Sequence, residues 1–542
     1  MVYDVTVIVP EGRDKDEGYI KQEAGRLLLA KGQRVNLNGA QLVVEKRSVD
    51  ARRRQIKIVL RCKLYVGEEP VPEDSALPQW LPASSSRKTV VIVGAGPAGL
   101  FGALKLLEKG IRCVIVERGS QISQRKVDIA RISREGLVDG NSNYCFGEGG
   151  AGCFSDGKLY TRSDKRGNLA QVLRIFNHFG ADPSILTAAH PHIGTDRLPA
   201  VIDAMWQKIE ELGCQFLFGH CCTDFIIDES AGGKRVCGVR VQDTKSGEEQ
   251  EIRADAVLLA TGHSAADIYM TLARIASESL EAKGFAFGVR VEHPRALIDR
   301  TQYHGDAEAI RKLGAAEYRL TSQVDGRGVY SFCMCPGGFV VPSASSPGQI
   351  VINGMSAAGR NSVWSNAAIV VETHPEDIPE RFRKEAEGLG CPALAGLLAR
   401  TWLEEETCRH GDGRQQAPAQ RLTDYLARRE SGSLPRTSYA PGLVASRLDE
   451  WLPPHLNERL GEAFRIFDGK MKGYVSDEAL IIASETRTST PVRILRDKES
   501  GESPVLRGLF PAGEGSGYSG GIASSAMDGI AQCGRILEAL GE

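Results

Sequence analysis

Two cysteines separated by one residue, Cys333 and Cys335, lie in the strand-like stretch FCMCPGGFVV. Side chains alternate along a β-strand, so both thiols are predicted to lie on one face, with Met334 on the other. A disulfide between residues this close would be strained and easily reduced, and the pair could therefore relay electrons to a bound redox cofactor. The alternatives are that the thiols fill the core, a common role of cysteine, or line a pocket without changing redox state.

Three other titratable residues lie in or beside turns of small residues. His263 follows the Thr-Gly turn of DAVLLATGHS and could titrate near neutral pH, although a histidine there could also cap a helix. Tyr518 belongs to GEGSGY, and Glu485 begins the run ETRTSTPVRI, whose arginines offer it structural ion pairs. These residues are candidates for proton transfer in a reaction whose electrons a cofactor carries.

The stretch that would hold such a cofactor is TVVIVGAGPAGLFGALKLLEKGIRCVIVERG, residues 89–119. Residues 89–93 are uncharged and β-favouring, as in a central parallel strand covered on both faces. A helix is predicted over 97–109, with proline in its first turn and a stop at Gly110, and a second strand follows. Strand, glycine turn, helix and strand in this order are typical of a dinucleotide-binding unit.

Each glycine of the turn has its own predicted role. Gly94 allows the tight turn, Gly96 lets the backbone approach a pyrophosphate, and Gly99 lets helix and strand pack closely. Unpaired N–H groups and the positive end of the helix dipole face the phosphates. Glu117, at the end of the second strand, is predicted to accept hydrogen bonds from both hydroxyls of an adenosine ribose and to repel a 2′-phosphate.

Two distant segments select among the possible dinucleotides. DAVLLATG, residues 255–262, is an apolar strand ending in Thr-Gly, and GLFPAGEGSGYSGGIASSAMDGI, residues 508–530, is a strand followed by glycines and a helix start. Both resemble the companion motifs of the glutathione-reductase-like flavoprotein superfamily. The resemblance implies that the first segment passes the adenine half of the cofactor and that the second sets a helix N-terminus against the flavin pyrimidine. FAD is therefore predicted in preference to NAD.

Further segments resemble a narrower family, the bacterial FAD-dependent dehydrogenases. They are FGEGGAGCFSDGKL, HPHIGTDRL, ATGHSAADIY, FCMCPGGFVV, ETRTSTPVRI and FPAGEGSGYSGGI, and the resemblance covers essentially the whole chain. It implies FAD and redox chemistry without a settled substrate. By this resemblance the first segment lines the pyrophosphate and isoalloxazine, the backbone near Cys222 passes the adenine, and Glu514 stands where an acid binds the ribityl or phosphate region.

Twenty residues are thus expected to bind FAD: Gly94, Gly96, Pro97, Ala98, Gly99, Glu117, Arg118, Gly149, Gly150, Ser155, Asp156, Lys158, Cys222, Thr261, Gly262, Arg487, Gly513, Glu514, Gly521 and Ile522. The catalytic candidates are His263, Cys333, Cys335, Glu485 and Tyr518. No set of residues has the spacing of a zinc site, and no metal is expected.

The predicted fold class is α/β, with a Rossmann-type, glutathione-reductase-like FAD-binding domain. Residues 1–67 are expected to form a small N-terminal α+β domain, and the acidic, proline-containing stretch 68–87 a linker. The FAD-binding domain is predicted over 88–283 and 481–542. Between these parts, strand-like runs followed by helical ones indicate an inserted mixed α+β substrate domain over 284–480, which would cover the flavin and form a pocket at the boundary.

Composition excludes several classes of partner. The 542 residues contain 67 Lys and Arg against 69 Asp and Glu, a net charge of −2, so no strong field points to nucleic acid or acidic membranes. We find no long apolar run or signal peptide and expect a cytoplasmic protein without a membrane partner. The 13 cysteines lack a disulfide-scaffold pattern, and most should be reduced thiols.

The sequence predicts an FAD-dependent oxidoreductase, of dehydrogenase type, acting on a small molecule. It holds no second GxGxxG after a strand, so no resident nicotinamide domain is expected, and the electron donor or acceptor stays open. Two alternatives remain: a flavin monooxygenase that uses external NAD(P)H, and an FAD-binding protein with a structural or group-transfer role.

Overall fold

A computed structural model describes residues 1–10, 12–51, 56–67, 77–83, 88–161, 167–229 and 232–542. Most of the predicted linker, 68–76 and 84–87, lies outside the described residues. Its middle part, 77–83, is held against the domain that follows, because Leu81 N donates to Leu107 O over 2.8 Å and Ala83 N donates to Leu212 O over 2.7 Å.

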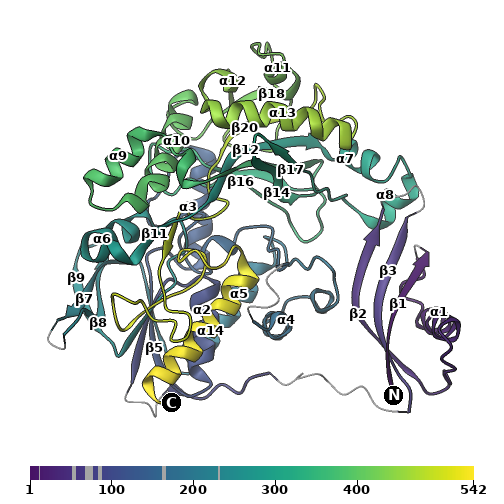
Figure 1. Cartoon of the computed structure of the whole chain (residues 1–542), viewed down its shortest axis with the longest axis horizontal. Coiled ribbons are helices and arrows are strands. Elements are labelled where there is room, and N and C mark those ends of the chain that lie inside the picture. Colours follow the sequence, from purple (N-terminus) through teal and green to yellow (C-terminus); the bar gives the residue numbers. More distant parts are fainter. Residues whose placement is uncertain (11, 52–55, 68–76, 84–87, 162–166, 230–231) are drawn as a thin grey trace.

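The N-terminal residues form a small α+β unit at one side of the molecule (Figure 1). Its antiparallel sheet has the order β1 (Val2–Pro10), β3 (Lys57–Tyr65), β2 (Gln41–Asp50). Alternate residues of β1 are buried, and α1 (Glu17–Ala30) packs its apolar side on them, giving this unit its own core. The unit meets the main body where Arg47 N donates to Thr187 O over 2.9 Å.

A five-stranded parallel sheet carries the glycine motif. Its order is β22 (Leu509–Pro511), β10 (Ala256–Leu259), β4 (Thr89–Val93), β5 (Arg112–Glu117), β6 (Gln215–Phe218). Four of the strands, β22, β10, β4 and β5, are short and almost fully buried, as expected for a parallel sheet covered by helices, and the edge strand β6 is partly exposed. The predicted α/β fold with a Rossmann-type sheet is therefore confirmed.

Helices α2 (Pro97–Leu107) and α14 (Ile522–Leu540) pack closely against each other beside this sheet (Figure 1). A Cβ at Gly529 of α14 would lie 2.1 Å from Ala98 O of α2, so only glycine permits this approach. Three further helices belong to the same region: α3 (Ile122–Glu135), α4 (Leu169–His178) and α5 (Leu198–Glu211).

An antiparallel meander interrupts the parallel sheet before β10. It consists of β7 (His220–Asp228), β8 (Arg235–Asp243) and β9 (Glu249–Arg253). The residues 214–227 do not form one continuous strand. The run breaks at Gly219, whose φ is +69°, so that its first half joins the parallel sheet as β6 and its second half begins the meander.

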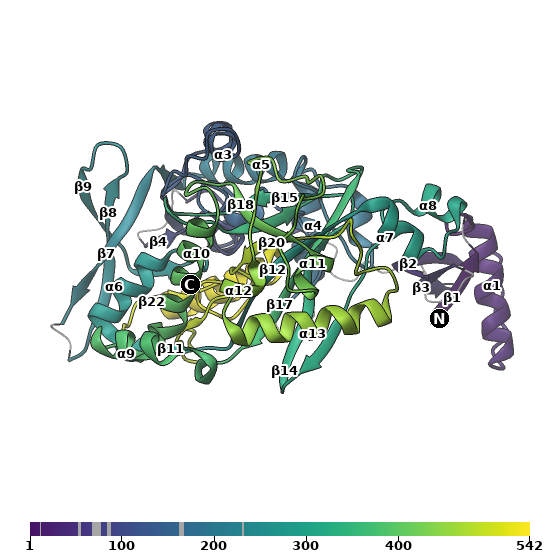
Figure 2. The same cartoon turned by 90° about the horizontal axis from the view of Figure 1, so that it is seen from above.

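A seven-stranded mixed sheet forms the other large layer (Figure 2). Its order is β13 (Thr321–Val324), β14 (Arg327–Cys335), β17 (Trp364–Thr373), β12 (Phe285–Pro294), β20 (Leu480–Glu485), β18 (Ala417–Arg421), β19 (Leu443–Ala445), and only the last pair is parallel. Strand β20 carries this sheet five residues beyond position 480, into the segment assigned from sequence to the FAD-binding domain.

Shorter elements complete the chain. Two-stranded sheets join β11 (Leu280–Ala282) to β21 (Val492–Ile494) and β15 (Phe339–Pro342) to β16 (Ile352–Met355). The remaining helices are α6 (Ala266–Ala276), α7 (Arg295–Gln302), α8 (Ala307–Leu313), α9 (Glu380–Gly388), α10 (Ala395–His410), α11 (Leu422–Leu426), α12 (Leu448–Trp451) and α13 (Pro454–Lys470). Within the described ranges, no helix combines the length and apolarity needed to cross a membrane.

Candidate functional site: an FAD cradle beside a second cavity

The glycine turn after β4 is built as its sequence predicts. Gly94 has a φ of +110°, and its N–H donates to Val116 O over 2.8 Å. A Cβ at this position would lie 2.4 Å from Ala260 O, and a Cβ at Gly99 would lie 2.0 Å from Gly94 O. Both glycines are therefore required by the protein's own packing, with or without a cofactor.

Gly96 differs from its neighbours because the space beside it is open. A Cβ at Gly96 would meet nothing nearer than Gly150 Cα, 3.8 Å away, and α2 begins at the next residue. The opposite wall is the segment FGEGGAGCFSDGKL, residues 146–159, which we call the glycine-rich loop. Its Gly149 N donates to Ala95 O over 3.0 Å. An anion between these walls would face the free N–H groups of the helix start.

The space between these walls continues into a cavity of about 310 Å³, which we call the cofactor cavity. It brings together most of the residues selected from sequence: Gly94, Gly96, Pro97, Ala98, Glu117, Gly150, Ser155, Asp156, Lys158, Thr261, Gly262, His263, Cys333, Glu485, Arg487, Gly513, Glu514, Gly521 and Ile522. Gly99 and Gly149 do not line the cavity but pack tightly against residues near its walls. A Cβ at Gly99 would lie 2.0 Å from Gly94 O, and a Cβ at Gly149 would lie 2.9 Å from Cys153 Cβ.

Glu117 is more heavily engaged than its predicted role requires. Its Oε2 accepts a hydrogen bond from Ala95 N over 3.0 Å, and its Oε1 accepts from Gly119 N and Gly147 N, each over 2.9 Å. A carboxylate offers about four acceptor positions, so about one is left for a ribose hydroxyl. The side chain ties the glycine turn to the glycine-rich loop, which the motif alone does not reveal.

We therefore expect Glu117→Ala to impair folding as well as cofactor binding. Three backbone N–H groups would lose a charged acceptor, and the free energy of unfolding should fall by about 2–4 kcal/mol. Urea unfolding with flavin fluorescence and far-UV circular dichroism measures both effects. Glu108→Ala, which removes a carboxylate at the solvent-facing end of α2, is the matched control. Unchanged stability of the Glu117 variant would contradict this role.

Arg118 and Cys222 line a small hollow that adjoins the cofactor cavity at Glu117. Arg118 forms an ion pair with Asp267, and its guanidinium lies 4.5 Å from the centre of the Phe146 ring. This hollow lies at the carboxyl end of β5, where the predicted adenosine half of the cofactor would sit.

His263 and Glu514 contact each other in the wall of the cofactor cavity, although 251 positions separate them in the sequence. Nδ1 of His263 lies 3.4 Å from Oε2 of Glu514. The other ring nitrogen, Nε2, is buried and has no hydrogen-bond partner among the described residues. A buried nitrogen of this kind is normally satisfied, so its position in the cavity wall indicates a ligand that supplies the missing partner.

Arg487 and Glu485 belong to two buried ion-pair networks. Arg487 donates to both carboxylate oxygens of Glu404, over 2.9 and 2.8 Å, and to Ser345 Oγ over 2.6 Å. Glu485 accepts from Arg290 Nε over 3.0 Å. Burial raises the pKa of Glu485 to about 7, while the positive charge of Arg290 opposes that rise. The structural ion pairing considered for this run is thus present at both residues.

Lys158 brings the two cysteines of β14 into the site. Its Nζ lies 3.8 Å from Cys333 Sγ and 3.9 Å from Cys335 Sγ, donates to Met334 O, and pairs with Asp156 over 3.4 Å. Burial alone would lower the pKa of the Lys158 ammonium, but the two sulfur atoms and Asp156 raise it. A hydrogen bond from the Cys335 thiol, followed by the charges of Lys158 and Arg290, lowers the pKa of Cys333 to about 5.

Both sulfur atoms lie on the Lys158 side, as expected, but the regular alternation behind that prediction is wrong. The pairing of β14 with β17 shifts register between Phe332 and Cys335, and Cys333 has a φ of +44°. The strand is therefore bulged at this motif. Met334, predicted to point away from the thiols, is also buried.

A larger cavity of about 980 Å³, the adjoining cavity, opens on the other side of Lys158 and Cys333. It shares five lining residues with the cofactor cavity: Lys158, Tyr160, Phe332, Cys333 and Gly520. Strands β13 and β14 supply much of its wall, and Arg360, paired with Glu317 over 2.5 Å, lines another part. A small molecule in this cavity would meet the cofactor cavity at Cys333.

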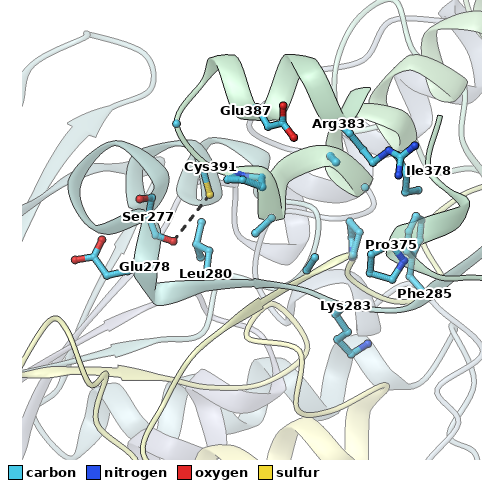
Figure 3. Close-up of a pocket in the computed structure, with 17 residues that line it drawn as sticks. Ser277, Glu278, Leu280, Lys283, Phe285, Pro375, Ile378, Arg383, Glu387 and Cys391 are labelled. Atoms are coloured by element: carbon cyan, nitrogen blue, oxygen red, sulfur yellow. Dashed lines mark hydrogen bonds between the residues drawn. The ribbon is translucent and has the colours of Figure 1, made fainter. Parts of the chain in front are cut away.

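Another hollow, of about 530 Å³, lies between β11 and the segment that links α9 to α10 (Figure 3). Cys391 and Ser277 face each other across part of it, with Cys391 Sγ 4.0 Å from Ser277 O. None of the residues selected from sequence lines this hollow.

Tyr518 is the catalytic candidate that the structure places apart from the rest. Its ring lies under Arg496, with the guanidinium 3.8 Å from the ring centre, and Arg496 pairs with Asp528. Among the residues described as lining the cofactor and adjoining cavities, Tyr518 is absent. Its described contacts are cation–π contacts with Arg496 and Arg493 near the start of α14, and its catalytic role stays a prediction.

Three buried arginines, Arg125, Arg290 and Arg400, were missed from sequence. Arg125 is fully buried in α3 and donates to Asn143 O, Tyr144 O and Glu148 O over 2.9, 3.0 and 2.6 Å, which fixes the glycine-rich loop. Its spacing is a local signal, because Arg125 shares the buried face of α3 with Ile122, Ile129 and Ile132 at intervals of three and four residues. Arg290 also left a signal, since a lone charge within the apolar strand run FAFGVRV is buried only when it is paired.

Comparison with known families supports the cofactor assignment. Residues 87–130 and 156–286 each match a family described as an FAD binding domain. Residues 284–488 match a family described as FAD-dependent protein, C-terminal domain-like. The open space beside Gly96 and the unpartnered Nε2 of His263 fit such a ligand. The protein is an FAD-binding flavoprotein, and FAD is its cofactor.

The chain also matches an uncharacterised protein of Clostridium beijerinckii along nearly its full length. The two are 37% identical over 517 residues, which covers 92% of each chain. The chain belongs to the same family as this clostridial protein.

Solved structures give weaker matches. A glycerol-3-phosphate dehydrogenase from Bacillus halodurans, complexed with FAD, is 12% identical, with a TM-score of 0.28 over 54% of this chain and 49% of that chain. A geranylgeranyl bacteriochlorophyll reductase-like protein from Thermoplasma acidophilum is also 12% identical, with a TM-score of 0.34 over 84% of this chain and 80% of that chain.

Proposed function

We propose that the protein is an FAD-dependent oxidoreductase of dehydrogenase type, as its resemblance to the bacterial FAD-dependent dehydrogenases implies. Its substrate would be a small molecule that binds in the adjoining cavity. The observation that carries the proposal is the shared wall of the two cavities, where Lys158 and Cys333 line both. A structural cofactor would not need a second cavity of about 980 Å³ beside it.

The residues of the cofactor cavity divide into binding and positioning roles under this proposal. The open turn at Gly96 and the start of α2 would hold the pyrophosphate, and His263 would donate to or accept from the cofactor through Nε2. When bound, FAD supplies two-electron redox chemistry. Lys158, whose ammonium is kept charged by its neighbours, would orient an electronegative atom of the substrate and hold a proton beside it.

Purified protein is expected to carry noncovalent FAD, and a substrate of the adjoining cavity should bleach it under anaerobic conditions. Acid release and chromatography identify the flavin, and a metabolite screen read at the flavin absorbance band identifies the substrate. FMN alone, or no flavin after reconstitution, would refute the cofactor assignment. Bleaching by NADPH followed by oxygen-dependent product formation would instead favour a monooxygenase.

A matched pair of variants tests the location of the substrate. Tyr330 lines the adjoining cavity but not the cofactor cavity and is half-buried, so Tyr330→Ala should raise the KM for the substrate while leaving flavin content unchanged. Arg383→Gln, in the hollow of Figure 3, should change neither quantity. An increase in KM for the Arg383 variant alone would place the substrate in that hollow and contradict the proposal.

A further inference from the structure

We propose that Cys333 and Cys335 form a redox-active dithiol, in which Cys333 attacks a disulfide-containing small molecule in the adjoining cavity and Cys335 resolves the mixed disulfide. The inference deepens the proposed function and rests on it for the supply of electrons. It names a substrate class, low-molecular-weight disulfides, and assigns a separate role to each cysteine.

The two thiols differ in access, as attacking and resolving thiols should. Cys333 lines both cavities and can be approached from the adjoining one. Cys335 has no exposed surface, and its Sγ lies 3.3 Å from Cys333 O. A substrate could therefore reach Cys333 but not Cys335, whereas Cys335 lies within the same turn of chain as the sulfur that it would attack.

The backbone at this motif is held in an unusual conformation. Cys333 has a φ of +44°, a left-handed value that non-glycine residues rarely adopt, and its carbonyl accepts from Arg290 Nη1 over 3.4 Å. Strain of this kind persists only where the surroundings enforce it, and it is concentrated at functional sites. Two thiols that merely fill a core would not require a bulge at the end of β14.

The charges around Cys333 favour its thiolate. The groups that face it are Lys158 from the glycine-rich loop, Arg290 from β12, Asp156, Glu485 and Cys335. Lys158 lies 3.8 Å from the sulfur, and the pKa of Cys333 is lowered to about 5, whereas that of Cys335 is raised. An ionised attacking thiol beside a protonated partner is the arrangement that thiol–disulfide exchange uses.

The proposed cycle balances in atoms and electrons. The Cys333 thiolate attacks one sulfur of the substrate disulfide, whose S–S bond breaks, and the first substrate thiolate leaves and takes up a proton. Cys335 then gives up its proton and attacks the Cys333 sulfur, which releases the second substrate thiol. The substrate has gained two electrons and two protons, one proton from Cys335 and one from water, and the protein has lost two electrons and one proton in forming the Cys333–Cys335 disulfide. Two electrons from reduced FAD, itself reduced by an external two-electron donor, restore the dithiol.

The test treats the holoenzyme with 4,4′-dithiodipyridine and maps the cysteines by mass spectrometry. Tryptic cleavage after Arg327 and Arg360 places both cysteines in one peptide, 328–360, which contains no other cysteine. We expect an internal disulfide in the wild-type peptide. In Cys335→Ser the probe should stay attached to Cys333, and in Cys333→Ser the buried Cys335 should remain unmodified. Anaerobic photoreduction of FAD in the oxidised holoenzyme should return the dithiol.

Further variants and control cysteines test whether Cys333 is activated by Lys158 or is only accessible to the probe. Lys158→Met should slow the reaction of Cys333 at neutral pH by about tenfold or more, and Lys158→Arg should restore most of the rate. Cys113 and Cys214, whose sulfurs lie 2.9 Å apart within the buried core, should not respond. A wild-type peptide that retains the probe, or Cys333 reacting no faster than Cys113, would overturn the proposal. Loss of FAD with the thiol chemistry intact would instead refute only the proposed function.

Discussion

Gly96→Val should yield a folded protein that no longer binds FAD. The backbone of Gly96 has a φ of −78° and a ψ of −175°, an extended conformation open to any residue. Its nearest neighbour would lie 3.8 Å from a new Cβ, so the branch point of the side chain meets only ordinary van der Waals contact in the apoprotein. That room is the space between the helix start and the glycine-rich loop, where the pyrophosphate would lie. The variant should weaken FAD binding by more than ~3 kcal/mol, about a hundredfold or more.

Two other glycine variants make the result interpretable. Gly96→Ala adds less volume and should weaken FAD binding by a smaller factor, with the same far-UV spectrum. Gly99→Ala should destabilise the apoprotein itself, because its Cβ would lie 2.0 Å from Gly94 O. Flavin content after reconstitution and the urea midpoint are measured on all three proteins. A Gly96→Val protein with normal flavin content would show that the cofactor does not lie in this turn.

Local patterns were sufficient to predict the cradle. The roles of Gly94 and Gly99 follow from the chain conformation and packing that a strand–turn–helix unit imposes, and the structure shows both. The parallel sheet was predictable for the same reason, since its uncharged strands must be covered on both faces. The end of α2 was predicted two residues too late, because the final turn before Gly110 is irregular.

Contacts between distant segments could not be predicted in this way. His263 and Glu514 were each selected from a separate motif, and nothing in either motif indicates that their side chains meet. Lys158 was assigned to the cofactor, whereas the structure also sets it between the two cysteines, 175 and 177 positions further along the chain. The adjoining cavity depends on how β13 and β14 pack against the rest of the protein, which has no local signature.

The bulge at Cys333 shows why a periodicity argument can reach a partly correct result. Alternation predicts that residues two positions apart share a face, and the two sulfurs do approach the same ammonium group. They do so through a left-handed residue and a register shift. Glycine residues 337 and 338 follow directly, and a Cβ at Gly337 would lie 1.8 Å from Arg360 O, so the following turn is tightly constrained. The Cys-Pro-Gly-Gly sequence at the end of this strand motif indicates an irregular strand end, because proline and glycine weaken regular strand pairing.

Arg290→Met should destabilise the seven-stranded sheet strongly. Arg290 is fully buried and donates to Glu485 Oε2, Asn366 Oδ1 and Asn353 Oδ1 over 3.0, 2.8 and 3.1 Å. Its loss leaves the buried carboxyl group of Glu485 and the amide oxygen of Asn366 without this donor, whereas Asn353 Oδ1 still accepts from Gly354 N. The expected cost is about 3–5 kcal/mol, and the pKa of Glu485, already raised to about 7 by burial, should rise further.

A double variant distinguishes the effect of the unpaired Glu485 carboxyl group from the effect of the other hydrogen bonds that Arg290 makes. Arg290→Met combined with Glu485→Leu removes both charges, and a large part of the stability should return because no buried carboxyl group is left unpaired. Recovery should be incomplete, since Asn366 Oδ1 still lacks the donor that Arg290 supplied. Arg327→Met, which breaks the partly exposed pair between Arg327 of β14 and Asp377, should change the urea midpoint far less. If the double variant is no more stable than Arg290→Met, Arg290 acts through the two asparagines and the carbonyl of Cys333, and its charge is secondary to its hydrogen bonds.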